Sequence, residues 1–196
     1  MTNQRLNDTL AAIDSINRQD PNVTDVNGAQ TPKELLYGER MSACLNKYWP
    51  DANEYLQIAV RAQHIKRWHL KRAEFPEGKS GYFTWRKELG KFHAELAKSL
   101  MLENGYSDDE GQITADIVKK TKLKSNENSQ TLEDVACLVF LMFYFDEFAA
   151  KYSESKIISI VQKTWNKMSD KGHEIALSLT LPPHLADIVG KALNGS

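Results

Sequence analysis

Apolar residues recur through most of this chain at the three-to-four-residue spacing of an α-helix, and this periodicity constrains the fold more than any other feature. Near the N-terminus, Leu6, Leu10, Ile13 and Ile16 fall on one side of a helix. The alternation that is typical of half-buried strands is nearly absent. The pattern therefore predicts an all-α protein, a compact multi-helix bundle of roughly eight or nine helices.

Turn and cap residues place the ends of the expected helices. Thr31 followed by Pro32 is typical of a helix start. Gly105 is typical of the position just past a helix end. Ser107 with Glu110 has the pattern of a capping box. We expect a first helix ending before residue 20, a polar loop over 22–30, and helices over about 33–48, 52–72, 84–104, 107–122 and 131–151, with three more towards the C-terminus.

The length of 196 residues fits one domain. We expect a single all-helical domain over 1–196, in which an N-terminal helix and polar loop (1–30) precede a core (31–180) and a C-terminal helix (181–196). The longest apolar run, residues 135–145, is too short to span a bilayer and is typical of a buried helix.

Charge and cysteine usage limit the partners and the compartment. The 25 Lys and Arg residues nearly balance the 26 Asp and Glu residues, so nothing draws the whole chain to a membrane or to nucleic acid, and any recognition of anions must be local. Cys44 and Cys137 lie far apart and are typical of buried thiols in a reducing compartment. No signal peptide is apparent at the N-terminus. We expect a cytoplasmic protein whose oligomeric state the sequence leaves open.

The run "KMSDK", residues 167–171, looks like the KMSKS loop of class I aminoacyl-tRNA synthetases. That loop works with a doubly wound nucleotide-binding domain, for which this chain has neither the strands nor the length. We interpret the run as a helix stop and restart, with Ser169 as the N-cap and Asp170 in the first turn.

Four ionisable side chains share helix faces that are otherwise apolar. They are His64, His93, Asp134 and Glu39, each from a different expected helix. A single inward histidine is usually a hydrogen-bonded core residue, but an uncompensated buried carboxylate costs roughly several kcal/mol or takes up a proton. Two imidazoles and one or two carboxylates aimed at one core therefore favour a bound divalent metal such as Mn²⁺, Fe²⁺ or Zn²⁺.

Long, specific stretches carry a family resemblance. They are "RAQHIKRW", "GYFTWRKELGKFHAELAKSLMLENGY", "QTLEDVACLVFLMFYF" and "KTWNKMSDKGHEIALSL". Over about residues 13–179 the chain resembles the domain-of-unknown-function family numbered 4202. That resemblance implies no established activity.

More distantly, the order of a histidine, then "HA", then "LEDVACL" resembles the HD-domain metal phosphohydrolases. This resemblance implies an HD-like helical bundle that holds a metal through His64, His93 and Asp134. Ala94 stands where that superfamily has a further aspartate, which bridges metals. Glu39 is the first candidate to supply the missing carboxylate, and Glu133 is the second.

Together these features predict a metal-dependent phosphohydrolase that acts on a small anionic substrate, which includes the nucleotides. Glu133 is the expected base for a metal-bound water. The residues expected to bind the anion are Arg67, Arg86, Arg61 and Gln63. Nearby aromatic residues such as Tyr82, Phe83 and Trp85 have the chemistry to stack on a base or sugar, although aromatics at helical spacing are more often core.

Two alternatives stay open. An HD-like site can also hold iron and activate O₂, which would make the protein an iron-dependent oxygenase. A helical binding module without catalysis is the other alternative, and Ala94 favours it.

Overall fold

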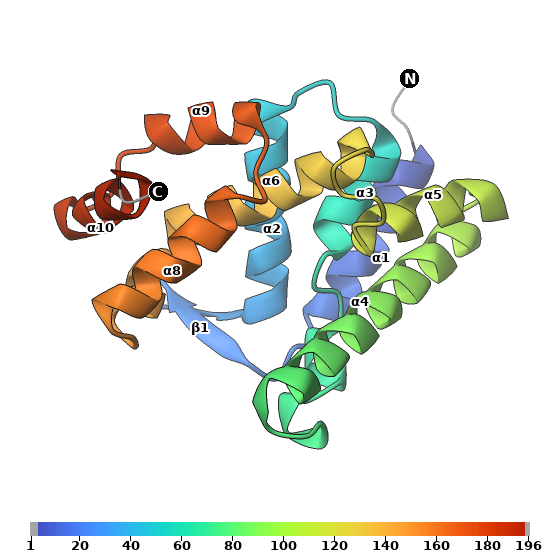
Figure 1. The fold of residues 1–196 in the computed structure, drawn as a ribbon. Coiled ribbons are helices and arrows are strands. Elements are labelled where there is room, and N and C mark those ends of the chain that lie inside the picture. The colour runs from blue at the N-terminus through green and yellow to red at the C-terminus, as the bar shows by residue number, and fades with distance from the viewer. Residues whose placement is uncertain (1–3, 195–196) are drawn as a thin grey trace. The chain divides into compact units, whose positions relative to one another are not determined.

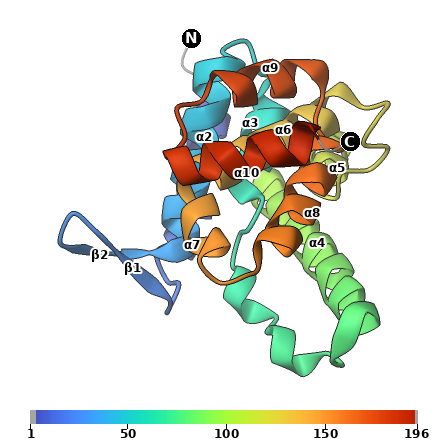
Figure 2. The same ribbon diagram turned by 60° about the vertical axis from the view of Figure 1, so that its left-hand side comes forward.

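The computed structural model describes residues 4–194 and is built almost entirely of helices (Figures 1 and 2). The predicted all-α class is confirmed. The chain divides into two compact units, Met1–Lys122 and Leu123–Ser196. The predicted segment boundaries at 30/31 and 180/181 stay predictions, and the outermost residues 1–3 and 195–196 lie outside the described part.

Over its described residues, 4–122, the first unit contains five α-helices and a small hairpin. Figure 1 shows two helices of this unit that are consecutive in sequence, α4 and α5, running side by side. The helices are α1 (Gln4–Asn17), α2 (Lys33–Tyr48), α3 (Glu54–Ala62), α4 (Gly78–Glu103) and α5 (Asp108–Val118). An apolar cluster that includes Ile13, Ile58 and Met101 joins α1, α3 and α4.

Several helix ends lie where the sequence predicted them. The second helix spans Lys33–Tyr48, the predicted range, although Pro32 and not Thr31 is its N-cap and no side chain caps it. Ser107 and Glu110 form the reciprocal capping box at the start of α5. Gly105 follows α4 with a φ of 87°, the left-handed conformation that glycine adopts without strain.

The prediction of a polar loop over residues 22–30 was wrong, because this segment forms an antiparallel hairpin of β1 (Val23–Val26) and β2 (Ala29–Pro32). Asn27 and Gly28 make its turn with φ values of 53° and 84°. An Asn-Gly pair between short strands is a strong hairpin signal. The prediction missed it because it relied on the polar composition of the segment. Figure 2 shows the hairpin standing apart from the helices of its unit.

The prediction of one helix over residues 52–72 was also wrong. Helix α3 ends at Ala62, and short 3₁₀ turns η1 (Arg67–His69) and η2 (Arg72–Glu74) follow. Lys66 adopts a left-handed conformation with a φ of 50°, and its N–H donates to Asn17 Oδ1 at 3.0 Å. This long-range hydrogen bond satisfies the N–H in a bent chain, so His64 lies on a turn and not on a helix face.

The second unit contains α6 (Glu127–Phe143), α7 (Phe145–Ala149), α8 (Glu154–Trp165), α9 (Asp170–Ser178) and α10 (Pro183–Asn194). The expected helix over 131–151 begins earlier and breaks at Tyr144, whose φ and ψ are −125° and −12°. Helices α8 and α10 pack together, as do α6 and α9. None of the described helices has an apolar stretch long enough to cross a membrane.

The interpretation of residues 167–171 as a helix stop and restart is confirmed. Helix α9 begins at Asp170, and the Ser169 hydroxyl accepts a hydrogen bond from the Gly172 N–H.

Candidate functional site

A buried asparagine brings two separate segments of the first unit together. Asn17 is 1% exposed at the end of α1. Its Nδ2 donates to the backbone carbonyl of Glu34 at 3.4 Å, and its Oδ1 accepts from the Lys66 N–H at 3.0 Å. The start of α2 is thereby held against the turn that carries His64.

The His64 imidazole lies between two side chains from α2. Its Nδ1 is 3.3 Å from Glu34 Oε2. Its ring stacks on the Tyr37 ring with 4.1 Å between centroids and 14° between planes. Glu34 is fixed in turn because its own N–H donates to Asp20 Oδ2 at 3.0 Å.

Arg67 completes a chain of contacts through the imidazole. Its Nη1 is 3.1 Å from His64 Nε2, and its Nε is 3.9 Å from Glu34 Oε1. Because a guanidinium only donates, His64 Nε2 is the acceptor and Nδ1 carries the proton that faces Glu34. The Arg67 guanidinium also lies over the Trp85 ring, 5.1 Å from its centroid.

His64, Glu34 and Arg67, together with His93 on α4, form a cluster that we call the His64 centre. His93 is its second imidazole. Its ring centroid is 6.2 Å from that of His64, and the residue is 3% exposed. Its Nδ1 lies 2.7 Å from the carbonyl oxygen of Ile65. A carbonyl only accepts, so Nδ1 donates and Nε2 holds a lone pair. That Nε2 is buried without a hydrogen-bond partner, a rare state in folded proteins.

Burial is the largest cause of the shifted pKa values of Glu34, His64 and His93. It raises the pKa of Glu34 to about 7, although the charge of Arg67 opposes the rise. It lowers the pKa of His64 well below the ordinary histidine value, and Arg67 adds to the fall. It lowers the pKa of His93 to about 4, against the opposing hydrogen bond to Ile65. Near neutral pH both imidazoles are therefore uncharged, and Glu34 neutralises Arg67 only in part.

A second guanidinium belongs to the same region. Arg86 is exposed on α4, and its positive charge contributes to the lowered pKa of both His64 and His93. Among the described residues, the Arg86 guanidinium has no carboxylate partner. The centre thus carries a net positive charge.

The other residues predicted to bind an anion are placed differently. Arg61 forms a two-pronged ion pair with Asp14, with contacts of 2.6 Å and 2.7 Å. Its guanidinium is therefore engaged in holding α1 to α3. Gln63 follows α3 directly, and its buried Oε1 has no hydrogen-bond partner.

The expectation that Glu39 points inwards was wrong, because its side chain is exposed on α2. The carboxylate of this helix that does reach the imidazoles is Glu34. Five residues correspond to about 1.4 helical turns, so the two side chains lie on different faces. Sequence reasoning missed Glu34 because the faces of a helix that meet neighbours depend on tertiary packing.

Glu133 and Asp134 belong to the second unit. Asp134 is 2% exposed and accepts hydrogen bonds from the Ser169 N–H at 2.8 Å and from the Ser169 hydroxyl at 2.5 Å. Glu133 is buried, with Lys167 Nζ at 3.6 Å. Both carboxylates are thus engaged by partners of their own unit, and their convergence with His64 and His93 stays a prediction.

The side chains of the His64 centre do not fit a metal site. Both imidazoles present Nε2, as metal ligands commonly do. However, His64 Nε2 already accepts from Arg67, which places a positive charge where a cation would bind. Within residues 4–194, no group of three or more His, Cys, Asp or Glu side chains is arranged to hold an ion.

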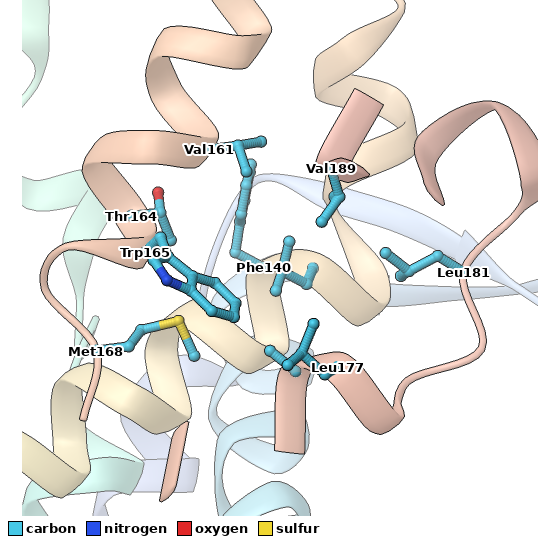
Figure 3. A pocket seen from close by; sticks show the side chains of 10 residues that line it. Phe140, Val161, Thr164, Trp165, Met168, Leu177, Leu181 and Val189 are labelled. Carbon is cyan, nitrogen blue, oxygen red and sulfur yellow. The ribbon is translucent and has the colours of Figure 1, made fainter. Parts of the chain in front are cut away.

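A separate pocket lies within the second unit, among α6, α8, α9 and α10 (Figure 3). Its walls are apolar except for the Thr164 hydroxyl and the Trp165 indole nitrogen. Without an ionisable side chain, this pocket offers no general acid or base. The wall residues labelled in Figure 3 include Phe140, Val161, Trp165, Met168, Leu177 and Val189.

Comparison with known proteins places the chain in a family. The model of the family described as "Domain of unknown function (DUF4202)" matches residues 7–189. The chain belongs to this family. No curated protein and no solved structure matches it. The predicted membership of DUF4202 is thus confirmed, whereas the more distant HD-domain resemblance stays a prediction.

Proposed function

We propose that this DUF4202 protein binds the phosphate group of a small anionic molecule at the His64 centre and hydrolyses its phosphoester bond. The observation that carries the proposal is the buried, unpartnered Nε2 of His93 beside guanidinium groups that Glu34 neutralises only in part. All of these side chains belong to the first unit.

The two guanidinium groups would bind the phosphate. Arg86 is exposed and has no carboxylate partner among the described residues, so its donors are available to a ligand. Arg67 is held in place by His64 and by the face of Trp85. Guanidinium groups bind phosphate oxygens through paired, charge-assisted hydrogen bonds.

His93 would act as the general base. Its Nδ1–H bond to the Ile65 carbonyl fixes the ring, so Nε2 can accept a proton from a water molecule. That water adds to phosphorus, the ester P–O bond breaks, and the proton passes from His93 to the leaving oxygen. His64 and Glu34 act as positioning residues, because their contacts orient Arg67.

Calorimetry with inorganic phosphate tests the binding step, using two variants on neighbouring residues of α4. Arg86→Ala should weaken phosphate binding by roughly tenfold or more, because it removes charge-assisted donors. Lys87→Ala removes an exposed charge of the same sign from another side of the helix, and it should change the affinity by less than about twofold. Equal effects of the two variants would show that phosphate responds only to the overall charge.

Hydrolysis of p-nitrophenyl phosphate in the presence of EDTA tests the chemical step. In His93→Asn, the amide nitrogen can replace Nδ1 and donate to the Ile65 carbonyl, while Nε2 is lost. The variant should bind phosphate as the wild type does but turn over at least about 100-fold more slowly. Turnover that needs added Mn²⁺, Fe²⁺ or Zn²⁺ would reject the metal-free mechanism, and binding without any turnover would identify a binding module.

A further inference from the structure

Two neighbouring aromatic side chains are exposed at the start of α4. Tyr82 is 43% exposed and Phe83 is 57% exposed, and their ring centroids are 5.8 Å apart. Adjacent aromatic rings that stay in water forgo the free energy of burial, and such patches commonly mark binding surfaces. The pair is therefore a candidate platform for an apolar or planar group.

The platform is continuous with the positive centre. The Tyr82 ring lies 5.9 Å, between centroids, from the Trp85 ring. The Arg67 guanidinium lies over the Trp85 ring and also contacts His64. A ligand that contacts Arg67 therefore has an aromatic surface beside it.

Helical spacing places the same groups along one stripe of α4. Arg86 lies one turn after Tyr82, and His93 lies two turns after Arg86. The stripe thus presents an exposed ring, then an unpartnered guanidinium, then the buried imidazole. Lys79, whose Nζ is 5.9 Å from the centroid of the Phe83 ring, adds a further positive charge at the outer end.

We propose that the ligand of this centre is a phosphate monoester that carries a planar aromatic ring. The ring stacks on Tyr82 with Phe83 against its edge, because the two side-chain rings are inclined by 62°, while the phosphate contacts Arg67 and Arg86. This inference rests on the proposed function, because it assumes that the centre binds phosphate. An aryl phosphate and a nucleoside monophosphate share this chemistry. A nucleic acid strand fits less well, because the whole chain carries 26 acidic and 25 basic residues and offers no overall attraction to a polyanion.

Competition calorimetry on the full chain compares four probes. Phenyl phosphate and adenosine monophosphate carry a planar aromatic ring, whereas glycerol phosphate and ribose 5-phosphate do not. The aromatic probes should bind at least about tenfold more tightly than the non-aromatic ones, as expected for one stacked ring. If only adenosine monophosphate binds more tightly, the platform selects a nucleobase. If phenyl phosphate also binds more tightly, the platform accepts any aromatic ring.

Variants test whether Tyr82 and Phe83 cause the higher affinity for probes with an aromatic ring. Tyr82→Ala and Phe83→Ala should each reduce, several-fold, the ratio of the affinity for the aromatic probes to that for the non-aromatic probes. Tyr82→Phe should keep this ratio, because an aromatic ring remains at the position. Leu102→Ala is the control, since Leu102 is a 42% exposed apolar residue near the other end of α4. A similar loss in Leu102→Ala would overturn the assignment.

The outcomes separate this inference from the proposed function. Equal affinity for the non-aromatic and the aromatic probes would overturn the inference and leave the proposed function standing. Absence of binding by all four probes would overturn both. A short single-stranded oligonucleotide that binds more tightly than adenosine monophosphate would overturn the inference of a small ligand.

Discussion

The ionisation of Glu34 should make the protein less stable as the pH rises, which is the reverse of the usual carboxyl behaviour. The side chain of Glu34 is 16% exposed, and its nearest contacts are the neutral His64 ring and the more distant Arg67 guanidinium. Burial raises its pKa from 4.5 to about 7. Ionising this carboxyl therefore costs free energy in the folded chain that it does not cost in the unfolded chain.

The direction and size of the effect follow from proton linkage. Between pH 4.5 and 7 the folded state holds a proton on Glu34 that the unfolded state has lost, so the free energy of unfolding falls as the pH rises through this window. A difference of 2.5 pKa units corresponds to about 3 kcal/mol once the carboxyl is fully ionised. Stability from this source is complete below pH 4.5 and lost above about pH 7.

Glu34→Gln isolates this contribution, because the amide keeps the shape of the protonated carboxyl and cannot ionise. His93 complicates the wild-type profile, since its pKa of about 4 makes stability rise with pH over part of the same window. Comparing the variant with the wild type removes that contribution. The difference in unfolding free energy, variant minus wild type, should therefore increase by about 3 kcal/mol between pH 4.5 and 8.

Urea unfolding followed by circular dichroism at a series of pH values measures this difference. Glu39→Gln is the matched control, because Glu39 is exposed on the same helix and its removal should leave the pH profile unchanged. A Glu34→Gln difference that stays flat within about 0.5 kcal/mol would refute the argument that burial holds this carboxyl protonated.

Three further substitutions test the contacts that build each unit, and the free energy of unfolding from urea curves measures their effects. A fourth prediction concerns the pH dependence of turnover. Gly81→Ala should destabilise the start of α4 by more than about 2 kcal/mol, because the new Cβ would lie 1.8 Å from the Pro76 carbonyl oxygen. Gly90→Ala, in open space on the same helix, should stabilise the protein by roughly 0.5–1 kcal/mol, and equal outcomes would contradict the packing argument. Ser169→Ala should cost about 1–2 kcal/mol, because it removes the α9 cap and a hydrogen bond to Asp134, and a neutral result would contradict that role. If His93 is the general base, the turnover rate should rise as the pH increases through about 4, the pKa of His93. A pH–rate profile without this rise would exclude His93 as the base.

The sequence by itself determined the fold class and many helix ends. Apolar periodicity and local cap residues decide these features, and both act over one or two helical turns. The capping box at Ser107 and the stop at Gly105 needed no knowledge of neighbouring helices. His93 was also correctly predicted to be buried, because α4 continues as a regular helix through its position. The hairpin at Asn27-Gly28 was within reach of the same local reasoning.

Only the tertiary structure decided which groups meet at the candidate site. The end of α3 depends on a hydrogen bond between Lys66 and Asn17, residues 49 positions apart, and no local pattern encodes it. The choice of Glu34 over Glu39 likewise depends on which face of α2 that same asparagine holds against the turn. The unpartnered Nε2 of His93 is visible only when every neighbour is in place. Local propensity specifies elements, whereas long-range contacts specify their rotation and ends, and those decide the chemistry of the site.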